Sequence, residues 1–196
     1  CEKEPTPVYS VPYRLTSAVV DQGRRFIIGS KRGIYLFENG RISWLNKVDP
    51  LLQCPISKLL KDTEGTVWIA TAGNGLLKFK NNKVTQISVK DGLISNLCTS
   101  LEIDESGDLW IGTNKGLSRL HNPKITKKNW DIKNLTVSNG LSSNEICNLK
   151  AFKNTLWVGT KSGLNSIDLD DVFTNGESPT YIQSVLINNK TVDSTQ

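Results

Sequence analysis

Short apolar segments alternate with short polar ones along this chain, and the same arrangement returns four times. Each copy has an apolar segment that ends in a small residue followed by Ser or Thr, then a Gly-containing turn and a second apolar segment. The copies lie at 25–34, 67–76, 109–117 and 156–164. Apolar runs of strand length bounded by such turns predict β-strands. Helical periodicity is absent over any window longer than about ten residues, so the pattern predicts an all-β protein.

One position of the repeat carries a large apolar residue, held in turn by Ile27, Trp68, Trp110 and Trp157. These residues lie 41, 42 and 47 positions apart. A period in the forties with a Trp-bearing strand in each copy is the spacing of a four-stranded β-propeller blade. We therefore predict β-propeller-type blades, as four four-stranded antiparallel units that form a partial propeller. The Trp residues are expected to be buried between blades rather than to stack on a sugar.

Small residues and turn residues repeat with the Trp. Two positions after it stands a residue that lets a neighbouring backbone approach closely, and Gly112 and Gly159 therefore belong with the Trp residues to the predicted repeat core. Before the Trp strand, Asp62 and Asp104 begin turns in which Asp bonds the following backbone and Gly supplies a positive φ. Weaker fourth strands are expected at 41–45, 83–89 and 130–137, whereas the fourth unit lacks a convincing one, because Asp168, Asp170 and Asp171 follow Ile167.

Two further tryptophans, Trp44 and Trp130, break the period and lie on these outer strands. They are freer than the periodic Trp residues to make surface contacts.

The repeat also sets the predicted domain boundaries. Residues 1–13, with three prolines, are expected to form an extended N-terminal arm. The propeller repeats follow at 14–175, in units of about 14–47, 48–90, 91–137 and 138–175. Residues 176–196 are a linker and the first strands of a further, truncated domain.

Composition narrows the classes of partner. The chain has 196 residues, of which 37% are hydrophobic, and no apolar run approaches the roughly 18 residues of a membrane span, so no direct membrane insertion is expected. The net charge is +5, but the 24 basic residues are scattered among 19 acidic ones. No stripe of basic and aromatic residues appears, so a solvated surface is favoured and no nucleic-acid partner is predicted.

The start of the chain allows two interpretations. There is no Met, and the sequence opens on Cys1 followed by Glu, Lys, Glu and Pro. This has the form of a lipoprotein start with an acylated Cys. The alternative is a piece of a longer chain whose boundary happens to fall on Cys.

The sequence gives little support for a catalytic or metal-binding site. The one histidine, His121, belongs to no recognisable Ser-His-Asp or Cys-His motif of a catalytic site. The cysteines form no CxxC pair of the kind that binds zinc. Asp62 and Asp104 recur by blade, which marks them as turn formers rather than an acid–base pair. Cys98 stands where the preceding unit has Ile56, so a buried thiol is expected there. We predict no enzyme activity, no metal and no cofactor.

The linkers between units make a family resemblance specific. The segments 90–96 (KDGLISN) and 138–144 (SNGLSSN) precede the third and fourth units. With the D-x-x-G-x-L-W-I-G-T-x-x-G-L pattern that follows, the sequence resembles the two-component regulator propeller repeat over roughly 15–167. The third unit fits almost letter for letter, and the first is degenerate. The resemblance implies the extracytoplasmic sensor region of a hybrid two-component system of the Bacteroidetes type.

The segment 178–192 carries a second resemblance, to the first strands of the tyrosine-rich immunoglobulin-like domain that follows such propellers. It is too short to close a sandwich of about 100 residues. Sensor propellers of this family typically have seven blades, and four units cannot close such a ring. Either four blades close tightly, or the chain is a fragment, or two copies complete one another.

Candidate ligand-binding residues gather at one end of the predicted blades. The turns between second and third strands and the linkers between units share that end, and they carry Arg32 (beside Lys31), Asn74, Lys115, Lys161, Asn96 and Asn144. Basic side chains at equivalent turns suit an anionic or heavily hydroxylated ligand. The plainer interpretation is that exposed turns favour Lys and that the Asn residues cap the linkers.

The function that the resemblance implies is a non-enzymatic, periplasmic or cell-surface sensor segment that binds an oligosaccharide. Its partners would be the rest of a sensor chain or a second copy. The alternative is a propeller scaffold for protein–protein interaction or self-assembly without a small ligand.

Overall fold

The computed structural model describes residues 13–21, 25–122, 130–170, 172, 185–187 and 190–192. The strands of the first sheet are β1 (Leu15–Val20), β2 (Phe26–Ser30), β3 (Gly33–Glu38) and β4 (Arg41–Trp44). Those of the second are β5 (Ile56–Lys61), β6 (Val67–Thr71), β7 (Leu76–Lys80) and β8 (Lys83–Ile87). The third sheet has β9 (Cys98–Ile103), β10 (Leu109–Thr113), β11 (Leu117–Leu120) and β12 (Ile132–Leu135). The fourth has β13 (Ile146–Phe152), β14 (Thr155–Thr160) and β15 (Gly163–Asp168).

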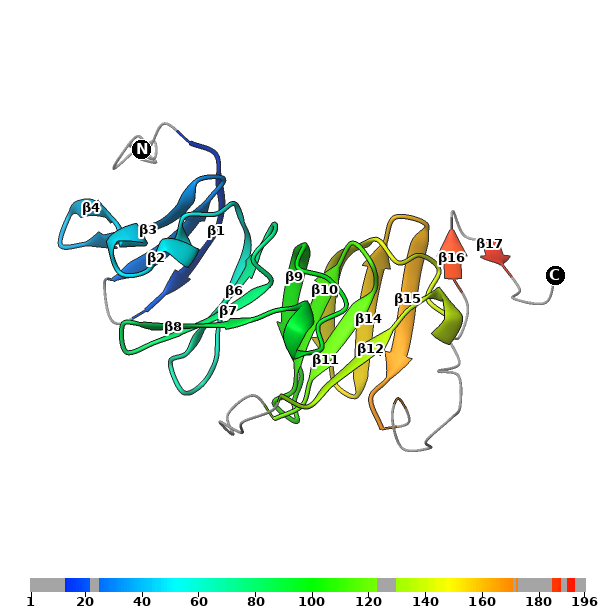
Figure 1. Cartoon of the computed structure of the whole chain (residues 1–196). Coiled ribbons are helices and arrows are strands. Elements are labelled where there is room, and N and C mark those ends of the chain that lie inside the picture. The colour runs from blue at the N-terminus through cyan, green and yellow to red at the C-terminus, as the bar shows by residue number, and fades with distance from the viewer. Residues whose placement is uncertain are drawn as a thin grey trace, which may run out of the picture.

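Each of these sheets is an antiparallel meander, and the four follow one another in chain order (Figure 1). The first strands β1, β5, β9 and β13 lie side by side along the molecule. Short 3₁₀ turns stand in the linkers, at Leu45–Lys47, Pro50–Leu52, Val89–Asp91 and Val137–Asn139. The prediction of an all-β protein with propeller-type blades is confirmed.

The fourth blade departs from the four strands predicted per unit, in the way that the sequence after Ile167 led us to expect. Among the described residues its sheet has three strands, because no strand pairs with the outer edge of β15. Beyond it, β16 (Val185–Ile187) and β17 (Lys190–Val192) pair with each other as a separate two-stranded sheet, and β16 contacts β15. The immunoglobulin-like assignment of this segment stays a prediction. Nearly all of the predicted N-terminal arm lies outside the described residues.

The hydrophobic core consists of three clusters, and each lies between two consecutive blades. The first cluster joins Ile27 and Ile34 of the first blade to Ile56, Leu59 and their neighbours in the second. The second cluster contains Trp68 with residues of β9 and β10, and the third contains Trp110 with residues of β13 and β14. Trp68 and Trp110 are buried, with 1% and 0% of their surface exposed, as predicted. Packing between blades is therefore what holds the molecule together.

The predicted burial of Trp157 is wrong. This side chain is 42% exposed, although it occupies the same strand position as Trp110. The reason is that Trp68 and Trp110 are covered by the blade that follows each of them, whereas no blade follows the fourth in the described structure.

The predicted role of the small residue on the Trp strand holds where a blade follows. A Cβ on Gly112 would lie 2.7 Å from Cγ2 of Ile146, and one on Gly29 would lie 2.7 Å from Cγ2 of Ile56. Between the second and third blades, Ala70 stands in place of the Gly and the smaller Cys98 in place of the Ile. The larger residue on one blade is thus matched by a smaller one on the other. At Gly159 the nearest atom of the described residues is the Asn148 carbonyl oxygen at 3.6 Å, in its own blade, so no described neighbouring blade meets it.

Asp62 and Asp104 form their turns as predicted and also bond the Trp that follows. Asp104 Oδ1 accepts from the backbone N–H of Asp108, while its Oδ2 accepts from the indole Nε1 of Trp110 at 2.7 Å. Asp62 does the same for Trp68 at 3.0 Å. The carboxylate thus satisfies an indole N–H that packing between blades removes from water.

Candidate ligand-binding rim

The turns between second and third strands share one end of the molecule. In each blade the turn backbone bonds to a residue just before the first strand of the same sheet. These bonds run from Lys31 N to Arg14 O, Ala72 N to Pro55 O, Asn114 N to Leu97 O and Lys161 N to Glu145 O. We call this end, with the linkers between the sheets, the rim.

A hydroxyl fixes the shape of each of these turns. Thr113 Oγ1 donates to Gly116 O at 2.7 Å and accepts from Lys115 N at 3.0 Å. Thr71, Thr160 and Ser30 make the equivalent pair of bonds in the other blades. The turns are therefore rigid platforms for the side chains that they expose.

The linkers are capped, and this accounts for two of the predicted ligand-binding residues. Ser88 and Asp91 form a capping box around the 3₁₀ turn that Gly92 ends at φ 108°. Asn96 Oδ1 accepts from Val89 N at 3.0 Å, and Asn144 Oδ1 accepts from Val137 N at 2.8 Å. Both side-chain oxygens thus hold their own linkers, which is the plainer of the two interpretations given above.

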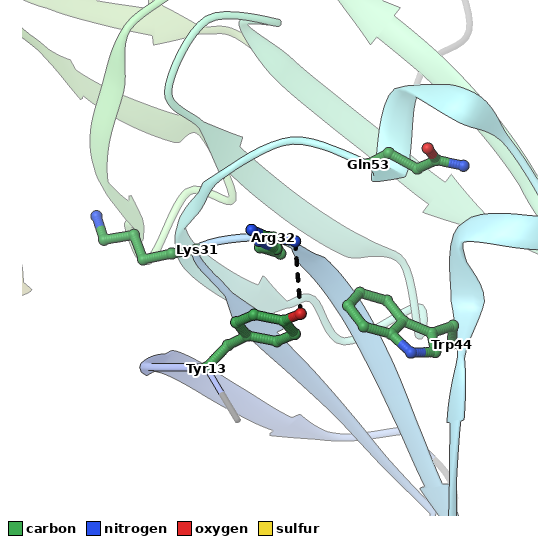
Figure 2. A pocket seen from close by; sticks show the side chains of 5 residues that line it. All are labelled: Tyr13, Lys31, Arg32, Trp44 and Gln53. Atoms are coloured by element: carbon green, nitrogen blue, oxygen red, sulfur yellow. Dashed lines mark hydrogen bonds between the residues drawn. The ribbon is translucent and has the colours of Figure 1, made fainter. Parts of the chain in front are cut away.

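The first blade has a hollow of about 380 Å³ at the rim, lined by Tyr13, Lys31, Arg32, Trp44 and Gln53. In Figure 2, Arg32 lies above the ring of Tyr13, Trp44 lies beside that ring with Gln53 above it, and Lys31 extends away from Trp44. Its walls come from the β2–β3 turn, the end of β4 and the residues before β1 and β5. Among the residues that the structure describes, two cations, two aromatic faces and an amide line it.

Contacts among the aromatic residues hold the hollow open. The guanidinium of Arg32 lies 4.8 Å from the centre of the Tyr13 ring, and its Nη1 donates to the Tyr13 hydroxyl at 3.4 Å. Trp44 meets Tyr13 edge to face at 6.1 Å and packs on Tyr35 at 4.2 Å between ring centres. Trp44 is 39% exposed, so an aromatic face and a guanidinium reach solvent side by side.

The other basic rim residues lie in other blades. Lys115 is exposed on its turn. Lys161 Nζ lies 3.2 Å from Glu145 Oε2, so its charge is partly balanced. Asn74 Nδ2 donates to Leu51 O at 3.4 Å and is half-buried. Of the six predicted ligand-binding residues, only Arg32 lines the hollow.

Sequence reasoning missed Tyr13 and Gln53 as lining residues, while it marked Trp44 only as an off-period Trp on an outer strand. Trp130 is also an off-period Trp on a predicted outer strand, but it does not line the hollow. Trp130 packs against the second core cluster, with Lys78 Nζ lying 5.6 Å from its ring centre and 5.2 Å from that of Trp68.

The opposite end of the third blade carries a buried carboxylate. Asp108 accepts from Arg119 Nε at 2.6 Å and from Asn122 N at 2.9 Å, and His121 Nδ1 lies 2.9 Å from its Oδ1. Burial by itself would raise the pKa of Asp108, but these partners outweigh it and hold the pKa below its usual range. His121 is thus tied into an ion-pair cluster away from the rim.

Two of the cysteines are buried, as the prediction for Cys98 required. Burial raises the pKa of the Cys98 thiol to about 12 and also raises that of Cys54. Cys147 is exposed. In the part of the chain that the structure describes, no three His, Cys, Asp or Glu side chains are grouped to hold a metal ion. The described helices include none that is long and apolar enough to cross a membrane.

Comparison with known families agrees with the linker and turn motifs. Residues 92–115, which run from the capped linker through the Trp110 strand to the Lys115 turn, match the two component regulator propeller family model. These residues of the third unit are thus similar to the two-component regulator propeller repeat. The resemblance read from the sequence is thereby confirmed over these residues. No curated protein matches the chain.

Solved structures of similar fold support the propeller-type blades. The extracellular domain of the hybrid two component system BT3049 from B. thetaiotaomicron aligns with a TM-score of 0.70 and 21% identity, over 94% of this chain and 24% of that one. That of BT4673 from the same organism gives 0.63 and 22%, over 90% and 24%. Virginiamycin B lyase from Staphylococcus aureus gives 0.58 and 13%, over 80% and 53%. The chain spans about a quarter of the length of the two extracellular domains.

Proposed function

We propose that this chain is a non-enzymatic, ligand-sensing propeller segment from the extracytoplasmic part of a two-component sensor, and that it binds an oligosaccharide at the rim. The matched repeat and the extracellular domains with the same fold support the sensor assignment. The finer expectation of periplasmic or cell-surface localisation, with Cys1 as an acylated anchor, belongs to the same proposal.

The observation that carries the ligand class is the hollow of the first blade. A sugar ring offers apolar C–H faces that stack on exposed aromatic rings and hydroxyls that bond to cations and amides. Trp44 supplies such a face, while Arg32 and Gln53 supply donors within the same hollow. The cations Lys31 and Arg32 among its described lining residues favour a ligand that is hydroxylated or anionic.

The rest of the rim suits a ligand of several sugar units. Asn74 and Lys115 stand at the equivalent turns of the next two blades, so an extended ligand that enters at Trp44 would pass them in order. Lys161 is a weaker candidate because Glu145 already pairs with it.

The absence of catalysis is likewise a proposal. One structural neighbour, virginiamycin B lyase, is an enzyme, but a likeness at 13% identity concerns the fold alone. In this chain the only histidine is bonded to Asp108 at the end opposite the rim. It therefore has no part in the hollow that we assign to the ligand.

A glycan array followed by titration tests the proposal. We expect the chain to bind one class of oligosaccharide and leave it chemically unchanged, with affinity falling at least about tenfold in Arg32→Ala and in Trp44→Ala, the loss of roughly 1.4 kcal/mol of contact. Lys115→Ala is expected to weaken binding less. Lys83→Ala, at an exposed lysine that begins β8 away from the rim, serves as the matched surface control, with a change below about threefold.

Two results would contradict this proposal. One is an array on which neutral and acidic oligosaccharides all fail to bind. The other is binding that Arg32→Ala and Trp44→Ala leave intact while their unfolding midpoints match that of the unmodified chain.

A further inference from the structure

The two ends of the row of blades present faces that are buried everywhere else in the molecule. We call the face that a blade turns to the next one its trailing face, and the opposite face its leading face. At each contact between blades, the trailing face contributes the residue at the Trp position and the small residue two positions after it. The leading face contributes the residue that opens the first strand, which is Ile56, Cys98 or Ile146. Among the described residues, no further blade packs on the trailing face of the fourth blade or on the leading face of the first.

Exposure separates these end faces from their buried equivalents. On the trailing side, Trp157 and Leu164 are 42% and 44% exposed, whereas Trp110 and Leu117 are both at 0%. On the leading side, Leu15 is 47% exposed, whereas its counterpart Ile56 is at 0%. Monomeric proteins seldom leave such faces uncovered, so they mark an interaction site.

The strand register identifies Leu15 as the counterpart of Ile56 and Ile146. Leu15 pairs with Ser30 just before a bulge in β1, as Ile56 pairs with Thr71 and Ile146 with Thr160 before equivalent bulges. Ile56 and Ile146 fill the space over Gly29 and Gly112. The first blade therefore carries an equivalent large side chain, Leu15, but no glycine of another described blade lies opposite it.

The receiving space is present at the other end of the chain. Gly159 holds the position of Gly29 and Gly112, and among the described residues a Cβ there would meet nothing closer than the Asn148 carbonyl oxygen at 3.6 Å. Beside it the exposed Cys147 occupies the bulge position that Thr99 holds in the third blade. Thr99 Oγ1 donates to Ile146 O of the following blade at 2.7 Å, so this position lies where two blades meet.

We infer that the trailing face of the fourth blade docks on the leading face of the first blade of a second copy, with Leu15 of the one over Gly159 of the other. Such a contact continues the interface that already occurs three times within the chain. Two copies joined head to tail at both ends have eight blades, which lies within the usual range of four to eight. A head-to-tail contact of this kind forms a closed ring when its rotation closes.

Like faces would not fit each other. Two trailing faces would bring glycine against glycine and leave a void, while two leading faces would bring one Leu15 against the other. The proposal therefore predicts a head-to-tail contact, and paired variants can separate it from a contact between like faces.

Light scattering on the full chain over a range of concentrations is the test. We expect twice the 21.7 kDa of one chain for the unmodified protein. Leu15→Asp and Gly159→Val should each be monomeric, since one buries a charge in the contact and the other fills the receiving space. Mixing the two variants should restore a dimer, because Leu15→Asp keeps an intact trailing face and Gly159→Val keeps an intact leading face. Val137→Asp, at a residue that is 50% exposed on a linker, is the control that should remain dimeric.

Thiol labelling of Cys147 in a Cys1→Ser background gives a second measurement. We expect labelling to slow at least about tenfold in the dimer and to be fast in both monomeric variants. An unmodified chain that stays monomeric with Cys147 accessible overturns the inference, because the faces then need another partner. A monomer with Cys147 protected also overturns it, since the chain then covers its own end. If Leu15→Asp or Gly159→Val alone remains dimeric, the contact joins like faces, and the head-to-tail inference is overturned.

Discussion

At the scale of single residues, the same side chain has different consequences in different blades. Trp110 is buried by the fourth blade and bonded to Asp104, whereas Trp157 is exposed and no Asp stands six residues before it. The repeat predicts where a Trp stands, but its burial depends on what lies against it.

Substitution of these two tryptophans should therefore differ in cost. Trp110→Ala is expected to lower the free energy of unfolding by about 3 to 5 kcal/mol, because it leaves a large cavity between blades. Trp157→Ala should cost about 1 kcal/mol or less, as at exposed sites. Urea unfolding in the monomeric Leu15→Asp background measures both. Equal losses would contradict the account of blade packing.

Asp108 makes stability depend on pH. Because its pKa is lower in the folded chain than in the unfolded one, its contribution is present above the unfolded pKa of about 3.9 and is lost as pH falls through the folded pKa. We expect Asp108→Asn to flatten the loss of stability below about pH 4. Urea midpoints between pH 2.5 and 6 check this, with exposed Asp170→Asn as the control that should keep the original slope. A parallel shift of the whole curve in Asp108→Asn would exclude the ion-pair explanation.

At the scale of elements, the period in the forties was enough to predict the strands and their order. The ends of the fourth strands could not be predicted from apolar runs alone. The run 83–89 looks like one strand, yet β8 ends at Ile87, because Ser88 and Asp91 cap a 3₁₀ turn that takes Val89. Thr136 and Asn139 do the same after β12.

The blade interface gives a matched pair of substitutions. Gly112→Val would drive a side chain into Ile146, at a cost of about 1 to 3 kcal/mol. Gly159→Val meets no neighbouring blade in the part of the chain that the structure describes, so in the Leu15→Asp background it should be nearly neutral. Thermal unfolding of the two variants compares them directly. A large loss in Gly159→Val would mean that this face is already covered within the chain.

At the scale of the whole molecule, the hollow brings together residues that no local pattern connects. Tyr13 precedes the first strand, Trp44 ends the fourth, and Gln53 belongs to the linker before the second blade. Their meeting depends on how the first blade is completed and joined to the next. The sequence could therefore predict a basic rim, with Arg32 among its residues, but not the aromatic walls beside it.

The measurement that tests the proposed sensor function most directly is an NMR spectrum of the indole N–H groups in the nitrogen-labelled chain. It is recorded while the oligosaccharide identified on the glycan array is added. Five indole signals are expected from the five tryptophans. The account predicts that the Trp44 signal shifts and saturates with the ligand. The signals of Trp68 and Trp110 should stay in place, and exchange slowly with solvent, because their N–H groups are buried against Asp62 and Asp104. An unchanged Trp44 signal in the presence of a bound oligosaccharide would contradict the assignment of the hollow, and spectra that no oligosaccharide alters would contradict the proposed function.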